Sequence, residues 1–415
     1  MKIIKIIICG VMITLISSIS LAADYTWVQY GADDKLIARA IIKKTDHPIE
    51  RQKECPIVLV DKKQREMQFR AMHDDPAIKE KIIVCEIDIT SATTVEIEGQ
   101  ELKLPPIRVN RFVVIGDTGC ENSFFSESHR RQKCDSKNWP FKAIADKVAN
   151  MSPDFVIHMG DYMYRDKYTN SEDEIKNKEM QWSFFKDDFF DPAKKLLKTA
   201  PMVFIRGNHE SCKYGGDGWF SFLESREYSE CLDYTESYNV HINDLKFSVF
   251  DSSAAAKGDK YTQEQLIKYS EDFAKLYNSL YSKHWLLIHQ PVIPLMKISD
   301  DETFVKELHA FVVKDAYKDK YSNKIPISIA GHYHVMAYLE RPKNNFIQMV
   351  IGNGGTNIHG AQKASYNLVI DEDKLTVNVK YGYTVFDRLE NYLWKATSYD
   401  VEGNILFVTN LSTKP

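Results

Sequence analysis

The chain has 415 residues, of which 44% are hydrophobic and 27% are charged. This composition is typical of a globular protein, and the length suits a large core with a smaller second domain. Lysine and arginine (54 residues) nearly balance aspartate and glutamate (58 residues), so the formal net charge is −4. A mildly acidic chain without a basic stripe is a poor candidate for nucleic-acid binding.

Residues 1–22 have the pattern of a secretory signal peptide. Lys2 and Lys5 precede an apolar run over residues 6–19, and Ser20 and Ala22 are small residues suitably placed for cleavage after Ala22. The alternative is a membrane anchor, but the run is short for a bilayer and no basic cluster follows it. We therefore predict a secreted or periplasmic protein that is not inserted in a membrane after cleavage.

The cysteines agree with export. Cys9 lies in the predicted signal peptide, and six cysteines remain: Cys55, Cys85, Cys120, Cys134, Cys212 and Cys231. An even number in an oxidising compartment predicts three disulfides. Because each consecutive pair lies in one local segment, we expect sequential pairing, Cys55–Cys85, Cys120–Cys134 and Cys212–Cys231. Free buried thiols are the alternative, and the absence of a C-x-x-C argues against a zinc site.

Two regions follow the signal peptide. Residues 23–107 are β-rich, with β-branched runs such as PIVLVD and KIIVCEIDI separated by polar turns. The stiff pair Pro105-Pro106 marks the predicted boundary. Residues 108–415 alternate short apolar strands with helical stretches such as residues 141–151, which predicts an α/β domain around a buried sheet.

Five strands of the second region each end in polar residues that could bind a metal. These ends are Gly116-Asp117, Gly160-Asp161 with Tyr164 close behind, Gly207-Asn208-His209-Glu210, His289, and Gly331-His332-Tyr333-His334. Ligands bind at the carboxyl ends of strands in α/β sheets, and a preceding glycine permits a tight turn. Carboxylate, amide, imidazole and phenol donors suit first-row divalent or trivalent ions. Seven donors exceed what one tetrahedral ion needs and fit two adjacent ions. His332 and His334 are two residues apart, so in extended backbone their side chains diverge toward different ions.

This ordered set resembles the calcineurin-like metallophosphoesterase superfamily, and within it the purple acid phosphatase branch. The usual superfamily motif Asp-x-His is Asp117-Thr118-Gly119 here and lacks the histidine. The purple acid phosphatase branch also lacks it and supplies a tyrosine three residues after the bridging aspartate, as Tyr164 follows Asp161. The resemblance covers about residues 111–356. It implies a central β-sandwich flanked by helices in four layers, preceded here by the small β-rich region.

The resemblance also implies roles for the site residues. The first ion would take Asp117, Asp161, Tyr164 and His334, and the second would take Asp161, Asn208, His289 and His332, with Asp161 bridging. A phenolate favours Fe(III) in the first site, and the second would hold Fe(II), Zn(II) or Mn(II), a choice that the sequence leaves open.

The expected reaction is hydrolysis of phosphate monoesters. The metal pair lowers the pKa of a bound water, and the resulting hydroxide attacks phosphorus in line. His209 binds no metal in this scheme and stabilises developing charge or protonates the leaving alkoxide. Glu210 orients a neighbouring ligand or His209, and His158 is expected to be buried and hydrogen-bonded rather than a ligand.

One departure from the branch concerns substrate specificity. Purple acid phosphatases usually carry another active-site histidine nine or ten residues after the ligand histidine, and no histidine lies there after His289. His359 is a potential substitute, although a surface role is the simpler interpretation. A phosphodiesterase or nucleotidase on the same metal centre is the alternative activity. A non-catalytic protein that retains the metal site, or an adhesin that uses the β-rich region, is the alternative class.

Overall fold

The computed structural model describes residues 23–43, 55–72, 82–121, 132–164, 182–254, 263–293, 296–297, 303–304, 321–358, 365–370 and 372–412. The predicted signal peptide lies outside the described residues. Within the described ranges, no helix combines the length and the apolar character needed to cross a membrane.

Two large sheets form the body of the protein. The ten-stranded sheet contains, in spatial order, β24 (Ile405–Ser412), β23 (Leu393–Asp400), β22 (Gly382–Glu390), β9 (Arg111–Ile115), β10 (Phe155–His158), β11 (Met202–Phe204), β1 (Tyr25–Tyr30), β2 (Leu36–Lys43), β6 (Ile82–Asp88) and β5 (Gln68–Phe69). The eight-stranded sheet contains β12 (Tyr238–Ile242), β13 (Leu245–Phe250), β14 (Trp285–Ile288), β17 (Ile327–Ala330), β19 (Phe346–Ile351), β18 (Met336–Arg341), β21 (Asp373–Asn378) and β20 (Tyr366–Ile370). All five strands whose ends carry the candidate ligands belong to these two sheets.

Smaller elements complete the described part of the chain. A four-stranded sheet contains β4 (Lys63–Glu66), β3 (Ile57–Val60), β7 (Val95–Ile97) and β8 (Gln100–Glu101), and β15 (Met296–Lys297) pairs with β16 (Thr303–Phe304). The helices are α2 (Phe141–Asn150), α4 (Asp191–Thr199), α5 (Gly216–Phe222) and α6 (Gln263–Ser279), with the π-helical turn η3 (Lys186–Phe190) and the 3-10 turns η1 (Ala32–Asp34), η4 (Asn208–Glu210), η5 (Tyr321–Asn323) and η6 (Pro342–Asn344).

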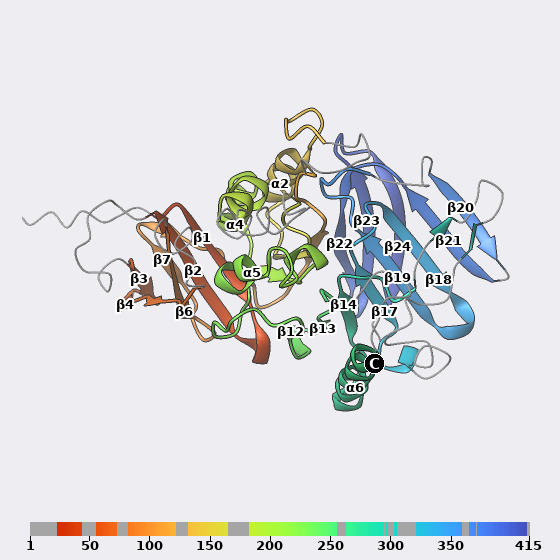
Figure 1. The fold of residues 1–415 in the computed structure, drawn as a ribbon, viewed down its shortest axis with the longest axis horizontal. Coiled ribbons are helices and arrows are strands. Elements are labelled where there is room, and N and C mark those ends of the chain that lie inside the picture. Colours follow the sequence, from red (N-terminus) through yellow and green to blue (C-terminus); the bar gives the residue numbers. More distant parts are fainter. Residues whose placement is uncertain are drawn as a thin grey trace, which may run out of the picture.

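Four layers follow from the alternation of side chains along the strands. In β9, Phe112 and Val114 face the core between the two large sheets, whereas Val113 and Ile115 face the core shared with α2, α4 and α5. Helix α6 covers the outer face of the eight-stranded sheet. Figure 1 shows α2, α4 and α5 grouped together and α6 apart from them. The predicted α/β fold with a sandwich flanked by helices is confirmed.

The centre of the inter-sheet core is aromatic. The ring of Phe112 stacks on Phe155 at 4.8 Å and on Phe386 at 4.4 Å, and the edges of Trp285 and Trp394 meet it at 6.0 and 5.2 Å. Aromatic pairs of this kind contribute beyond their buried area. The packing fixes the two sheets against each other, and therefore fixes the loops that leave their ends.

The N-terminal β-rich region extends the ten-stranded sheet. Strand β1 runs parallel to β11, with Gln29 opposite Met202, and β2 and β6 continue the sheet in antiparallel register. The four-stranded sheet contributes Val58 and Val95 to the same core as the two large sheets. Strands from both sides of residue 107 thus share one sheet, and a domain boundary at that point stays a prediction.

The three predicted disulfides are present with the sequential pairing. Cys55 bonds to Cys85 in β6, and the other pairs are Cys120–Cys134 and Cys212–Cys231. The second pair begins three residues after Asp117 and the third begins three residues after His209. In the entropy model, closing loops of 14 and 19 residues contributes about 3 kcal/mol each, so both cross-links restrain segments close to the candidate site.

Candidate metal centre

The candidate ligands come from loops at the carboxyl ends of strands in both large sheets. Strands β9, β10 and β11 are parallel neighbours in the ten-stranded sheet, and β14 and β17 are parallel neighbours in the eight-stranded sheet. Because parallel strands end at one edge, the loops of each sheet lie together. The packing of the two sheets then brings both edges to one place.

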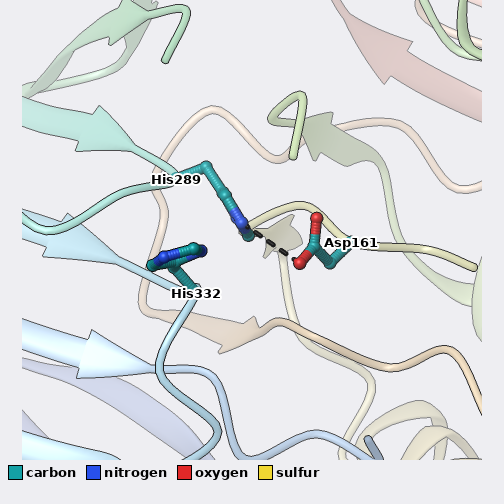
Figure 2. A group of neighbouring side chains, drawn as sticks. All are labelled: Asp161, His289 and His332. Atoms are coloured by element: carbon teal, nitrogen blue, oxygen red, sulfur yellow. Dashed lines mark ion pairs between the residues drawn. The ribbon is translucent and has the colours of Figure 1, made fainter. Parts of the chain in front are cut away.

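Two groups of side chains there are close enough to hold a metal ion, and they share Asp161. The first group is Asp117, Asp161 and His334, and the second is Asp161, His289 and His332, with the potential ligand atoms of each group within 4.8 Å of one another. Figure 2 shows the second group, with His289 and His332 directed toward Asp161 from the loops of the other sheet.

Tyr164 completes the first group. Its hydroxyl lies 2.6 Å from Asp161 Oδ2, 3.2 Å from Asp117 Oδ1 and 2.9 Å from His334 Nε2. A single phenolic oxygen therefore contacts all three members of the group. Burial, together with the charges of Asp161 and Asp117, raises the pKa of Tyr164 well above its usual value, which favours the neutral phenol.

Asn208 completes the second group. Its Oδ1 lies 3.1 Å from His289 Nε2 and 2.7 Å from His332 Nδ1, and His289 Nε2 lies 3.3 Å from Asp161 Oδ2. One amide oxygen thus lies beside two imidazole nitrogens, and one of these nitrogens also lies beside a carboxylate oxygen of Asp161. His332 and His334 fall in different groups, as their spacing predicts.

Two backbone carbonyls orient the histidines. His289 Nδ1 lies 2.7 Å from the carbonyl oxygen of Met159, and His334 Nδ1 lies 2.7 Å from that of Asn357. Each Nδ1 donates a proton to its carbonyl, which directs Nε2 toward the shared centre, an arrangement common to metal-binding histidines. The sequence carries no signal for these two carbonyls, because only the fold brings them to the rings.

The backbone at the site adopts unusual conformations. Asp117, Asp161 and His332 have φ values of 54°, 58° and 69°, and each directly follows a glycine. Left-handed backbone is uncommon for residues with a side chain and is found at functional sites. A methyl group added at Gly207 would collide with the Asp161 carboxylate, and one at Gly331 would lie 2.5 Å from Asp117 Oδ2. Gly207 and Gly331 are therefore required by close packing around the two carboxylates.

The charges at the site fit bound cations. Asp117 and Asp161 are 0% and 1% exposed, and within the described part of the chain no lysine or arginine pairs with either carboxylate. Burial, with the charge of Asp161, raises the pKa of Asp117 well above its usual value. Burial also disfavours ionised Asp161, but the charges of His289 and His209 hold its pKa well below the usual value. Two buried acids with oxygen, nitrogen and phenol donors around them are a suitable donor set for hard or borderline metal ions.

A layer of side chains behind the candidate ligands fixes the loops. The buried carboxylate of Glu210 accepts backbone N–H groups of Asp161, Tyr162 and Gly207 at 2.9–3.0 Å. Burial, with the charge of Asp161, raises the pKa of Glu210 to about 8. Glu210 thus positions the Asp161 loop, in agreement with the orienting role expected for it.

His158 is buried, as expected, and belongs to neither group. Its Nε2 lies 2.9 Å from the hydroxyl of Thr118, and its Nδ1 accepts the N–H of Gly160 at 3.2 Å. Its ring stacks on Tyr162 with centroids 4.0 Å apart. Both nitrogens are engaged in packing the loops, and burial lowers the pKa of the imidazole well below its usual value.

His209 lies beside the first group without joining it. Its ring centroid is 4.0 Å from that of Tyr164, and its backbone N–H donates to Asp161 Oδ1 at 3.0 Å. The side chain is half-buried, like Asn208, His332 and His334, so this side of the centre faces solvent. His209 is thus adjacent to the candidate metal ligands and accessible to a substrate.

The region where the branch usually has a further histidine is described only in part. Gln290, which follows His289, is buried and bonds to Ser252 through its side chain and its backbone. Residues 298 and 299, at the usual spacing, and His359 lie outside the described residues. His359 as a substitute stays a prediction.

Comparisons with known proteins agree with this geometry. Residues 110–336, more than half of the chain, match the family model of the calcineurin-like phosphoesterases. Among solved structures, the purple acid phosphatase PPD1 of yellow lupin (Lupinus luteus) has a TM-score of 0.61 at 12% identity, with 94% of this chain and 74% of that chain covered. PhoD has a TM-score of 0.55 at 12% identity, with 94% and 92% covered. No match was found among curated proteins.

At such low identity the structural likeness establishes a shared fold, and the family match concerns the region that carries every candidate ligand. Proteins of this family use two metal ions, and the two groups around Asp161 are able to bind them. The chain therefore belongs to the calcineurin-like phosphoesterase family and is a hydrolase that acts on phosphoric esters.

Proposed function

We propose that this protein is a dinuclear phosphatase that hydrolyses phosphate monoesters outside the cytoplasm. The observation that carries the proposal is the position of Asp161 in both metal-binding groups. One carboxylate common to two donor sets is the arrangement that a bridged pair of ions requires.

In this proposal Asp117, Asp161, Tyr164 and His334 hold the first ion, and Asp161, Asn208, His289 and His332 hold the second. A pair of ions bound there supplies Lewis acidity for the phosphoryl oxygens and lowers the pKa of the attacking water. The phenol of Tyr164 favours Fe(III) in the first site, with Fe(II), Zn(II) or Mn(II) in the second. The half-buried donors on the solvent side leave room for the phosphate.

His209 is the proposed general acid. As the oxygen of the attacking water bonds to phosphorus and that water loses a proton to solvent, the P–O bond to the alcohol breaks, and the imidazolium of His209 would give its proton to the departing oxygen. The tilted ring contact with Tyr164 holds the imidazole beside the first group, and the bond from its backbone N–H to Asp161 fixes the start of the loop. The same side chain therefore lies next to the proposed metal ligands, on the side of the centre that faces solvent.

The test is metal analysis of the purified protein followed by assays on a panel of mono- and diesters. We expect two ions per chain and faster turnover of monoesters than of diesters. Turnover of diesters alone would replace the monoesterase proposal by the phosphodiesterase alternative. Two bound ions with no turnover of any ester would favour a binding protein that retains the metal site.

We also propose export with removal of residues 1–22, on the basis of the N-terminal sequence and the three disulfides. Mass spectrometry of extracytoplasmic protein should find Ala23 as the first residue. An intact Met1 in that material would contradict cleavage.

A further inference from the structure

Helix α5 ends without a glycine cap. The last carbonyl groups of a helix have no partner within it, and a glycine in left-handed conformation commonly completes the end. Here Leu223, Glu224 and Ser225 follow α5, and the N–H groups of Leu223 and Glu224 both donate to one carbonyl, that of Trp219. The carbonyls of Phe220, Phe222, Leu223 and Glu224 need partners from elsewhere in the fold.

Three side chains from the N-terminal region supply these partners. Arg39, in β2, donates from Nη1 to the Phe222 carbonyl at 2.8 Å and from Nη2 to the Glu224 carbonyl at 2.6 Å. Arg70, which follows β5, donates to the carbonyls of Phe220 and Glu224 at 2.9 and 3.0 Å. Gln29, in β1, donates to the Leu223 carbonyl at 2.9 Å. We call Gln29, Arg39 and Arg70 the α5 cap.

The cap is buried and charged. Arg39 and Arg70 are 0% and 2% exposed, and both pair with Glu86 of β6 at about 3 Å. Burial and the adjacent charge of Arg70 lower the pKa of Arg39 to about 9. Cations at a helix C-terminus are favoured by the helix dipole, and the guanidinium fork can reach two carbonyls at once. The buried guanidinium groups of Arg39 and Arg70 therefore attach the end of α5 to the N-terminal strands.

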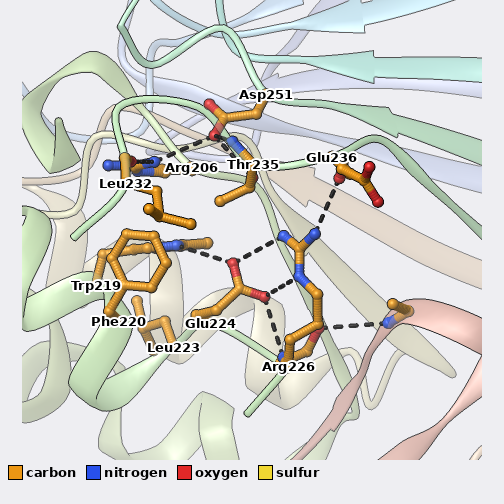
Figure 3. Close-up of polar contacts among 12 residues, drawn as sticks. Arg206, Trp219, Phe220, Leu223, Glu224, Arg226, Leu232, Thr235, Glu236 and Asp251 are labelled. Atoms are coloured by element: carbon orange, nitrogen blue, oxygen red, sulfur yellow. Dashed lines mark hydrogen bonds and ion pairs between the residues drawn. The ribbon is translucent and has the colours of Figure 1, made fainter. Parts of the chain in front are cut away.

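A second set of contacts holds the same end from the other side. Figure 3 shows the Glu224 carboxylate between the indole of Trp219 and the guanidinium of Arg226, with which it forms bonds of 3.3 Å and 2.9 Å. Arg226 in turn donates to the carbonyl of Glu236 at 3.0 Å. The end of α5 is therefore fixed both by its own following segment and by the N-terminal region.

The other end of α5 leads directly to His209. The N–H of Gly215, the residue before α5, donates to the carbonyl of His209 at 2.9 Å, and the N–H of Trp219 donates to the carbonyl of Gly215 at 3.0 Å. A helix of seven residues is a rigid segment roughly 10 Å long. The start of α5 is thus connected through Gly215 to the backbone of His209.

We propose that Arg39 and Arg70 are positioning residues for His209: by capping α5, the N-terminal region fixes the His209 imidazole over Tyr164 beside the metal centre. The inference rests on the proposed role of His209 as general acid. It gives the N-terminal strands a part in the reaction although none of their residues reaches the metal-binding groups in the described part of the chain.

The first test compares Arg39→Lys with Arg111→Lys as the matched control. Lysine keeps the charge but loses the fork, and Arg111 forms an exposed pair with Asp387. We expect Arg39→Lys to lower kcat about 10-fold for an alkyl phosphate, which needs a proton at its leaving oxygen, and much less for 4-nitrophenyl phosphate, which needs none. Equal losses on both esters, with unchanged metal content, would overturn the proposal. Arg70→Lys serves in the same way if Arg39→Lys does not fold.

A double-mutant cycle with His209→Ala shows whether the loss of kcat in Arg39→Lys depends on His209. If the cap acts through His209, Arg39→Lys changes kcat by less than about 2-fold in the His209→Ala background, because coupled residues are not additive. A full additional loss in that background would mean that Arg39 acts elsewhere.

A third measurement is independent of activity. In the zinc-loaded protein, the His209 ring signals, assigned through His209→Gln, should be displaced by the ring current of Tyr164. Arg39→Lys should move these signals toward the values of an unstacked imidazole, and Arg111→Lys should leave them in place. Unmoved signals in Arg39→Lys would contradict the positioning role, whereas failure of the parent protein to hydrolyse any ester would refute only the proposed function.

Discussion

Two buried clusters of charged side chains differ in how their charges are compensated. At the end of α5, each guanidinium meets the Glu86 carboxylate and backbone carbonyls, and Glu224 meets Arg226. At the metal centre, the carboxylates of Asp117 and Asp161 are equally buried, but no arginine or lysine of the described ranges pairs with them. The carboxylates of the first cluster are paired with arginines, whereas those of the second are paired, within the same ranges, only with histidines, Asp161 with His289 and Asp117 with His334. The second cluster also has the donor atoms of Tyr164 and Asn208 beside it.

This difference distinguishes buried charged side chains that stabilise the fold from those that are suited to bind a metal ion. A buried arginine–carboxylate pair holds one arrangement of the chain, and removal of one partner costs stability. Buried carboxylates beside one another, on residues with positive φ, are unfavourable unless positive charge lies beside them, from histidine or from a bound cation, and such strain gathers at functional sites. Burial alone would not distinguish the two clusters, whereas the partners of their carboxylates do: arginines in the first cluster and histidines in the second.

The largest expected effect comes from Asp161→Asn. Because Asp161 belongs to both groups, the neutral amide should lower affinity for both ions, and turnover should fall at least about 10³-fold, the loss of several kcal/mol of metal catalysis. Metal analysis and kcat measure the effect, and Asp387→Asn on the surface is the control. A variant that keeps two ions and the parent turnover would contradict the proposal that Asp161 binds both ions.

His209→Ala should lower kcat strongly while the metal content stays near that of the parent protein. General acid–base groups contribute about 10²–10⁴-fold, and His209 belongs to neither metal-binding group. Steady-state kinetics together with metal analysis separate the two properties. A parent-like kcat would reduce His209 to a loop residue, and a loss of metal would make it a ligand.

Glu224→Gln tests the compensated cluster through the dependence of stability on pH. Burial disfavours the carboxylate, but the charge and hydrogen bonds of Arg226 hold the pKa of Glu224 at about 2, below its usual 4.5. A depressed pKa adds stability above about pH 4.5 that is lost as pH falls toward 2, roughly 3 kcal/mol for a shift of this size.

The free energy of unfolding, measured in urea from pH 6 to pH 2, should therefore differ most between parent and Glu224→Gln at the upper end and converge at the lower end. Glu402→Gln at an exposed turn is the control and should follow the parent. A constant difference across the range would show that Glu224 is not the titrating group.

Tyr164→Phe has the smallest expected effect, because it removes one donor of several. The phenolate of an Fe(III)-loaded first site gives a visible charge-transfer band, as expected from the resemblance to the purple enzymes, and the variant should lose or shift it while the fold survives. Absorption spectra and metal stoichiometry are the measurements. A colourless iron-loaded parent, with full metal retention in Tyr164→Phe, would refute the phenolate and leave a divalent pair in its place.

Much of the metal centre could be predicted from local sequence. A short apolar strand, a glycine and a polar residue recur at Asp117, Asp161, Asn208 and His332, because tight turns at strand ends need the glycine and the chemistry needs the donor. The missing histidine after Asp117 and the presence of Tyr164 are also visible locally. The cysteine pairs could be predicted for the same reason, since each pair closes one segment.

The tertiary structure alone decided which residues surround those ligands. The carbonyls of Met159 and Asn357 reach the histidines only because two sheets pack face to face around the aromatic core, and carbonyls leave no mark in a sequence. The N-terminal strands likewise join the ten-stranded sheet and bring Arg39 and Arg70 to α5, across 180 residues of chain or more in the case of Arg39. Local patterns specify turns and donors, whereas contacts between distant segments depend on packing that no single segment determines.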